Sequence, residues 1–306
     1  MAELDVRRLA LLAEVAGEGS ISAAAKAAGY TPSAVSQQIA KLEREAGQPL
    51  LERHARGISL TDGGRALVGR AGRIANEIRA ARAELDEIAG LRSGSVRLGS
   101  FPTASASLLP LAVKGFGLQH PDITVSVRSA LRAELLEMLH VRDVELALLW
   151  DYDWDRIEDS SLELLPLIDD PTALLVSAGH RLADRSAVPL EELAREQWVT
   201  RADDHPLGDV LRRVTARAGA EPQITFEAHD YHEVQAMVAV GLGVALAPRT
   251  ALTNLREDVR VIDVSPGAPV RRIMLARLAD RRLTPAEEGM RSEFITAAAE
   301  LAATFR

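Results

Sequence analysis

The spacing of apolar residues in the first sixty positions predicts two short helices followed by a wing. The second helix carries four apolar residues at intervals of three or four, which places them on one buried face. These residues are Val35, Ile39, Leu42 and Ala46. Gly29 stands between the helices, where the turn needs a positive φ that costs other residues energy. Thr31 can cap the second helix, and Pro32 suits its first position.

The opposite face of the second helix is polar and is suited to the major groove of DNA. We therefore predict DNA contacts from residues in and around this helix and from two arginines of the wing. They are Ser22, Thr31, Pro32, Ser33, Ser36, Gln37, Gln38 and Lys41, with Arg53 and Arg56 as backbone anchors. Capped pairs of Ala-rich helices also occur in proteins that do not bind DNA, so this segment by itself leaves both interpretations open.

The stretch from Thr61 to residue 92 contains no proline and repeats apolar residues at spacings of four and three. This heptad pattern is typical of a coiled coil, and charges of both signs flank it. The seam consists of Leu67, Ala71, Ile74, Ile78, Ala81, Leu85 and Ile88. We predict that the helix pairs two copies of the chain, because two half-sites on DNA need two readers. The alternative is a helix that packs on its own domain.

Beyond residue 93, apolar strands alternate with helical patterns, which predicts an α/β fold with parallel strands. Strands are expected at 96–99, 123–128, 145–150, 172–177, 198–199, 224–228, 244–247, 259–264 and 271–278. Helices are expected at 104–117, 132–140, 207–218, 231–241 and 285–304.

Ligand pockets in such sheets lie beyond the carboxyl ends of the strands. The residues at those ends are therefore candidate effector contacts: Ser100, Phe101, Thr103, Ser129 and Trp150 from the first set of strands, and Asp203, His205, Tyr231 and His232 from the second. Helix N-terminal amides near Ser100, Phe101 and Thr103 could hold an anion. Ser100 and Thr103 are favoured, with ordinary loop polarity as the alternative at each of these positions.

Composition narrows the class of protein. Hydrophobic residues make up 47% and charged residues 26% of the 306 residues, as in ordinary soluble globular proteins. No apolar run approaches a membrane span and no signal-peptide core is visible, so we expect a cytoplasmic protein without a membrane partner. The absence of cysteine excludes disulfides, thiolate metal sites and cysteine redox switches.

The net charge of −8 is unusual for a DNA-binding protein, but it is unevenly distributed. Residues 1–73 contain ten Lys/Arg and eight Asp/Glu and carry +2, so the remainder carries −10. DNA affinity should therefore depend on a few well-placed cations more than on a general positive field.

Motifs for catalysis are absent from the sequence. His229 and His232 are close in sequence but lack the spacing of a zinc-protease motif, and no third ligand suggests itself. No nucleophile elbow, phosphate-binding loop or dinucleotide-binding motif is present. We predict no catalytic residues, no metal and no cofactor. An α/β enzyme with a DNA-binding head is the alternative from another class.

Several segments together resemble the LysR-type transcriptional regulators. They are SISAAAKAAG (20–29), SAVSQQI (33–39), Leu42-Glu43, PLLER (49–53), Arg56-Gly57 and LTDGG (60–64), in family order, with the long helix after them. The helix–Gly–strand segment at 231–248 is also similar.

The resemblance implies three parts: a winged helix-turn-helix (1–60), a coiled-coil linker helix (61–92) and an effector-binding domain (93–306). The last would be like a periplasmic binding protein, with one α/β subdomain at 93–164 and 266–306 and another at 165–265. Its crossovers are expected near 162–166 and 264–269. The implied partners are operator DNA, a small-molecule effector, further copies of the chain up to a homotetramer, and RNA polymerase. A ligand-independent repressor, whose C-terminal lobes serve only oligomerisation, is the alternative.

The sequence departs from the family pattern in three places. Pro32 stands where the family often has Gln, and Leu51 where it usually has Phe. Arg132 replaces the usual Ser or Thr, and it could bind a carboxylate effector or lie on the helix surface. The acidic, aromatic run at 151–155 could favour a cationic effector or form a solvated loop. These two features leave the charge of the effector open.

Overall fold

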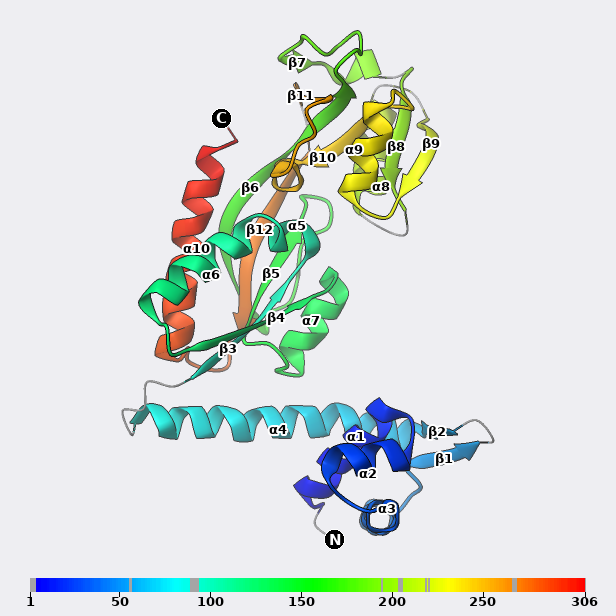
Figure 1. The fold of residues 1–306 in the computed structure, drawn as a ribbon, viewed down its shortest axis with the longest axis vertical. Coiled ribbons are helices and arrows are strands. Elements are labelled where there is room, and N and C mark those ends of the chain that lie inside the picture. Colours follow the sequence, from blue (N-terminus) through cyan, green and yellow to red (C-terminus); the bar gives the residue numbers. More distant parts are fainter. Residues whose placement is uncertain are drawn as a thin grey trace. The chain divides into compact units, whose positions relative to one another are not determined.

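The computed structural model describes residues 4–54, 57–88, 94–193, 195–202, 206–217, 219, 221–265 and 269–305. The chain folds into two compact units, one containing α1 to α4 and the other most of the C-terminal region (Figure 1). The fold class is as expected: a winged helix-turn-helix, a long helix and an α/β domain. The expected parallel pairing is wrong at the centre of its sheet, where the strand at 162–177 pairs antiparallel with those at 245–248, 259–264 and 270–278. Within the described ranges, no helix combines the length and apolar character needed to cross a bilayer.

The N-terminal unit is built from α1 (Val6–Glu18), α2 (Ile21–Ala28) and α3 (Pro32–Ala46). Two antiparallel strands, β1 (Leu51–His54) and β2 (Gly57–Leu60), form the wing. Helix α1 is not predicted by the sequence pattern above, yet it supplies three leucines and a valine to the core. The buried residues of this core are Leu9, Leu11, Leu12, Val15, Ala24, Ala25, Val35, Ile39, Leu42, Leu50 and Ala71.

The helix boundaries of this unit confirm the predicted turn chemistry. Ser20 caps α2 by accepting from the Ala23 amide at 3.1 Å, and Thr31 caps α3 by accepting from the Ala34 amide at 3.2 Å. Gly29 has φ +71°, a backbone conformation that L side chains rarely adopt. The entry angle of α3 is therefore fixed by local chemistry.

The wing is fastened to α3 and to the start of the long helix α4 (Asp62–Ile88). The Glu43 carboxylate accepts from the Leu50 amide at 2.9 Å and from the Leu51 amide at 3.3 Å. Thr61 donates to the Pro49 carbonyl at 2.9 Å. A methyl group on Gly64 would lie 2.1 Å from the Leu50 carbonyl oxygen. These motif residues therefore position the wing.

The C-terminal domain contains an eight-stranded sheet in which seven strands follow the order β4-β3-β5-β12-β6-β11-β7, while β10 pairs with β6; a separate pair is formed by β8 and β9. The strands are β3 (Ser95–Ser100), β4 (Thr124–Ser129), β5 (Leu146–Asp151), β6 (Leu162–Ser177), β7 (Ala187–Val188), β8 (Gln197–Arg201), β9 (Gln223–Ala228), β10 (Ala245–Pro248), β11 (Val259–Val264) and β12 (Val270–Leu278). The helices are α5 (Pro102–Ser105), α6 (Leu108–Gln119), α7 (Arg132–His140), α8 (Pro206–Arg217), α9 (Tyr231–Ala239) and α10 (Pro285–Ala303), with short 3-10 turns η1 (Leu190–Leu193) and η2 (Arg249–Leu252).

The long strand β6 passes from one lobe of this domain to the other (Figure 1). Its residues Leu162–Pro171 pair with β12, whereas Thr172–Ser177 pair with β10 and β11. We call the lobe with β3–β5, α5–α7 and α10 the first lobe, and the lobe with β8–β11, α8 and α9 the second. The change of partner falls at Pro171/Thr172, later than the expected crossover at 162–166, because β6 stays continuous and exchanges neighbours without a loop.

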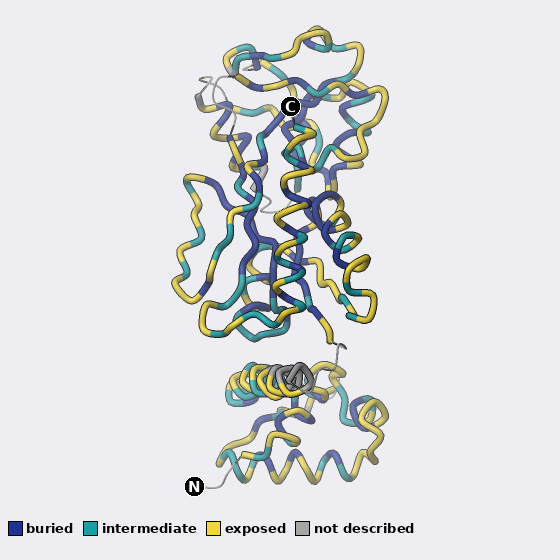
Figure 2. The backbone as a smooth tube through the Cα atoms, turned by 90° about the vertical axis from the view of Figure 1, so that its left-hand side faces the viewer, coloured by how far each residue is buried: buried dark blue, intermediate teal, exposed yellow. Residues whose placement is uncertain are grey.

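Buried residues gather in the interior of the C-terminal domain (Figure 2), along β5, most of β12 and Thr172–Val176 of β6. All six residues of β5 are buried, so its near-continuous apolar run reflects cover on both faces. On the outside, α10 packs against α6 and β6. The expected helix at 104–117 is interrupted: α5 is one turn, and α6 starts at Leu108 because Ser107 leaves helical geometry and bonds back to the Thr103 carbonyl.

Candidate DNA-binding surface and effector site

The outer face of α3 carries the predicted DNA contacts. Val35, Ile39 and Leu42 are buried, while the residues between them at helical spacing point outward. Ser33, Gln37 and Lys41 are exposed, Ser36 is half-buried, and Ser22, Thr31 and Pro32 are exposed at the neighbouring turn. Tyr30, beside them, is 61% exposed. The helix thus offers amide, hydroxyl and ammonium groups, the set that reads base edges and phosphates.

Gln38 has a different environment. Its side-chain oxygen accepts from Arg8 Nε at 3.0 Å, and the same guanidinium forms an ion pair with Glu45 at 2.5 Å. Arg8 therefore ties α1 to α3 through both residues. Gln38 is exposed like Gln37, but its acceptor oxygen is already engaged, so only its amide hydrogens are left for base contacts.

The wing cations are only partly described. Arg53 lies on β1, paired with Ile58 of β2, and its side chain is outside the described part of the chain. Arg56 also lies outside the described residues. Their assignment as phosphate anchors stays a prediction from the sequence.

The heptad seam of α4 divides into two halves. Ala71 is buried, and Leu67 and Ile74 pack against the helix-turn-helix core of their own chain. Further along, Ala81 is exposed, and Ile78 and Leu85 are 55% and 63% exposed. The side chain of Ile88 is outside the described part. The first half accords with the alternative of a helix packed on its own domain, and the second half leaves an apolar stripe uncovered.

The junction of the two lobes holds a buried ion pair that the sequence did not reveal. Arg271 of β12 and Asp170 of β6 are 4% and 0% exposed at the side chain, with Nη2–Oδ2 at 2.7 Å. The same Nη2 reaches the hydroxyl of Thr103 at 2.9 Å and that of Thr250 at 2.7 Å. Asp170 also accepts from the Thr250 amide at 3.1 Å. Through this one nitrogen, Arg271 links Thr103 of α5, in the first lobe, to Thr250 of η2, next to the second lobe.

Aromatic side chains surround this pair. The Arg271 guanidinium lies 5.1 Å from the centre of the Phe101 ring, and Phe101 packs on Trp150 at 4.7 Å. Tyr231, at the start of α9, is buried, and burial raises its pKa above the ordinary value while the charge of Arg271 opposes the shift. Arg201, at the end of β8, lies over the Tyr231 ring at 5.4 Å.

Two buried polar atoms of the second lobe have no hydrogen-bond partner among the described residues: the Thr200 hydroxyl and Arg201 Nε. Thr200 is the preceding residue of β8, so its side chain points to the opposite face of the strand, whereas Arg201 lies over the Tyr231 ring. An unmade bond to a buried donor costs about 1–3 kcal/mol, so an acceptor is expected at this position.

The other predicted effector residues are placed as follows. Ser100 is buried, and its hydroxyl oxygen accepts from the Ser105 hydroxyl at 2.9 Å. The Thr103 hydroxyl accepts from Arg271 Nη2, and the Phe101 ring packs against the Trp150 ring. Ser129 and His232 are exposed. Asp203 and His205 lie outside the described residues.

The expected anion site at helix amides near Ser100–Thr103 is not supported. Pro102 lacks an amide hydrogen, and α5 is a single turn of four residues, so few aligned amides are available. The hydroxyl of Thr103 already receives a guanidinium hydrogen. The sequence could not show this, because the helix appeared continuous and Arg271 is far along the chain.

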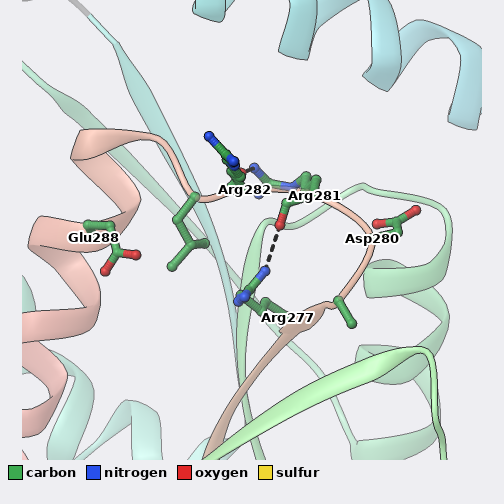
Figure 3. A pocket seen from close by; sticks show the side chains of 7 residues that line it. Arg277, Asp280, Arg281, Arg282 and Glu288 are labelled. Carbon is green, nitrogen blue, oxygen red and sulfur yellow. Dashed lines mark hydrogen bonds between the residues drawn. The ribbon is translucent and has the colours of Figure 1, made fainter.

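A hollow of about 510 Å³ at the β12–α10 turn is lined by three arginines (Figure 3). Arg277 donates to the Arg281 carbonyl at 2.7 Å and pairs with Glu163, while Arg281 makes two 2.8 Å bonds to Glu287. Asp280 and Glu288 also line it. Because carboxylates balance these arginines, the hollow has no clear preference for an anion. In the described part of the chain, no group of three His, Asp or Glu side chains could hold a metal.

Comparison with protein families finds two matches along the chain. Residues 6–65 match the family described as bacterial regulatory helix-turn-helix protein, lysR family, and residues 89–299 match the LysR substrate binding domain. The chain belongs to the LysR family. This LysR-type chain is 30% identical over 261 residues to the transcriptional dual regulator GltC of Bacillus subtilis, covering 84% of this chain and 86% of that protein.

Solved structures share the fold of this LysR-type chain. A full-length OxyR variant from Pseudomonas aeruginosa has a TM-score of 0.75 at 19% identity, covering 99% of this chain and 97% of that one. Full-length CbnR complexed with its target DNA has a TM-score of 0.72 at 20% identity, covering 96% and 100%. The chain is therefore a DNA-binding transcriptional regulator with an effector-binding domain, and it is not an enzyme.

Proposed function

We propose that this regulator reads its operator through Ser33, Ser36, Gln37 and Lys41 of α3, with Ser22, Thr31 and Pro32 beside them. Arg53 and Arg56 would anchor the wing on the DNA backbone. The supporting observation is the outward polar face of α3 opposite its buried apolar face. The working domains are 1–60, 61–92 and 93–306. A regulator works where the bacterial DNA is, so we also propose a cytoplasmic location.

The test uses DNA selected from random sequence by the wild-type protein. Gln37→Ala should lose about 1–3 kcal/mol on the selected site and relax the preference at one base pair. Lys41→Ala should weaken binding to all sequences and lower the salt slope by about one. Gln38→Ala is the matched control and should leave base preference unchanged. If only Gln38→Ala alters the selected sequence, α3 is docked differently.

We propose that two chains pair through the uncovered half of α4, along Ile78, Ala81, Leu85 and Ile88. The first half of the seam (Leu67, Ala71 and Ile74) would hold the helix to its own DNA-binding domain. This arrangement would place two copies of α3 at a fixed separation, as two half-sites require. The family resemblance also supports a homotetramer and contact with RNA polymerase, and the proposal includes both.

We infer that the effector binds at the lobe junction, with Arg201 and Tyr231 on one side and Phe101 and Thr103 on the other. The buried Nε hydrogen of Arg201 calls for an acceptor, which indicates an effector bearing a carboxylate or carbonyl oxygen. Arg271 is already neutralised by Asp170, so it contributes orientation more than charge. A thiol switch is excluded because the chain has no cysteine.

A thermal-shift screen of the full chain tests this site, using small carboxylic acids and their primary amides. A ligand should raise the melting temperature of the wild type, and Arg201→Ala should abolish the rise without altering DNA-free stability by more than about 1 kcal/mol. Arg181→Ala, which removes an exposed arginine elsewhere in the second lobe, serves as control. If no compound stabilises the chain, the ligand-independent repressor is favoured.

A further inference from the structure

Arg132 and the acidic, aromatic run at 151–155 interact with each other. Arg132 Nη1 donates to the Asp155 carbonyl at 3.3 Å, and its Nη2 forms an ion pair with the Asp155 carboxylate. The sequence offered each as a candidate for opposite effector charges. Because the two charges neutralise each other, they give the site no net preference for the charge of an effector, and we consider a different role for this loop.

The loop is a tight and well-anchored hairpin. Tyr152 and Asp155 form an antiparallel bridge, closed by the Asp155 amide donating to the Tyr152 carbonyl at 3.0 Å. At its base, the buried Asp151 carboxylate accepts from Arg272 Nε at 2.8 Å and from the Ile157 amide at 3.2 Å. The first lobe therefore holds the loop firmly at both ends of the hairpin.

Trp154 extends from this hairpin to the second lobe. Its ring stacks on Tyr152 of the same loop, with centres 4.7 Å apart and planes 9° from parallel. The guanidinium of Arg213, on α8, lies 4.6 Å from the centre of the Trp154 ring. An aromatic pair fixed to the first lobe thus binds a cation fixed to a helix of the second.

We propose that Tyr152, Trp154 and Arg213 form a clasp that favours the closed arrangement of the lobes and yields when they move. A cation–π contact near the surface is worth a factor of about two to five in an equilibrium. A clasp of that strength shifts the equilibrium between lobe arrangements, and the binding energy of a small ligand can overcome it. The proposal deepens the proposed effector function, since it rests on lobes that move about β6 and β12.

The first measurement is acrylamide quenching of tryptophan fluorescence in the effector-free full chain. Trp150 and Trp198 are buried, so the half-buried Trp154 dominates the accessible signal. Arg213→Ala should raise the quenching constant about twofold, the lower end of the cation–π range. Arg212→Ala is the matched control, because Arg212 neighbours it on α8 but pairs with Asp209. Adding Trp154→Phe to either variant should remove any difference between them.

The second measurement reports the lobes directly. The chain has no cysteine, so Glu300→Cys on α10 and Glu257→Cys before β11 can be spin-labelled without background. Labelled chains are diluted with unlabelled wild type so that distances within one chain dominate. Arg213→Ala should broaden the distance distribution measured by electron paramagnetic resonance, and Arg212→Ala should not.

Both changes together support the clasp. A rise in quenching with an unchanged distance distribution would mean that the contact is local and would overturn the proposal, as would no change in either. Arg132→Ala gives an independent check, because loosening the hairpin should act in the same direction as Arg213→Ala. None of these measurements needs an effector, so failure of the ligand screen and failure of the clasp are distinguishable.

Discussion

The buried ion pair between Arg271 and Asp170 allows a quantitative prediction about the lobe junction. Replacing Arg271 by Met keeps the volume of the stem but leaves the Asp170 carboxylate buried, and among the described residues Thr250 is then its remaining side-chain-bound donor. Thr103 loses its partner at the same time. Removing one member of a buried pair costs about 3–5 kcal/mol, because the remaining charge is uncompensated.

A double variant separates that cost from lost packing. Asp170→Asn removes the charge and keeps an oxygen for the Thr250 amide, so Arg271→Met with Asp170→Asn should recover at least half of the loss. Arg212→Met tests an exposed pair, whose side chains are 67% and 59% accessible, and should change stability by less than about 1 kcal/mol. The contrast isolates the effect of burial.

Urea unfolding followed by tryptophan fluorescence measures this domain alone, since all three tryptophans lie beyond residue 149. With a slope of about 2 kcal/mol per molar urea, Arg271→Met should lower the midpoint by about 1.5–2.5 M. A midpoint within about 0.5 M of the wild type, or a double variant no more stable than the single one, would refute the reasoning.

Three further predictions follow from local geometry. Gly64→Ala should destabilise the N-terminal domain by about 1–3 kcal/mol, because the new methyl would lie 2.1 Å from the Leu50 carbonyl oxygen. Gly69→Ala on the same helix meets no neighbouring atom and should stabilise the domain by about 0.5–1 kcal/mol. Thermal unfolding followed by circular dichroism compares the two variants, and equal effects would contradict this packing. Ile78→Asp should dissociate the chains, as measured by sedimentation, and leave the helix-turn-helix folded, whereas Ile74→Asp should also destabilise the helix-turn-helix core. If Ile78→Asp sediments as the wild-type oligomer, the chains do not pair through this seam. Because burial raises the pKa of Tyr231 in the folded state, the contribution of this residue to stability is complete below about pH 10 and is lost as the pH rises above that value. Tyr231→Phe should therefore flatten the fall of the urea midpoint at alkaline pH. An unchanged slope of midpoint against pH would contradict this prediction.

The helix-turn-helix and the wing could be predicted from the sequence, apart from α1, because their determinants are local. Ser20, Gly29 and Thr31 act within four residues of their own positions, and the buried face of α3 follows from a period of 3.6. Most strands of the effector domain were also located to within one or two residues. The α5–α6 break was missed, because no proline or glycine interrupts the pattern at Ala106 and Ser107.

Tertiary structure decided which polar residues are available for function. Three arginines show this, because each bonds to a polar partner that is distant in sequence: Arg8 to Gln38 and Glu45, Arg132 to Asp155, and Arg271 to Asp170, 101 positions away. The heptad seam shows the same limit, since its spacing identifies an apolar stripe but not the surface that covers each half. A periodic pattern is a property of one segment, whereas the partner of a charge or an apolar face depends on chain topology. The sequence by itself therefore determined most of the elements and the family, and the packing of distant segments determined the candidate effector contacts.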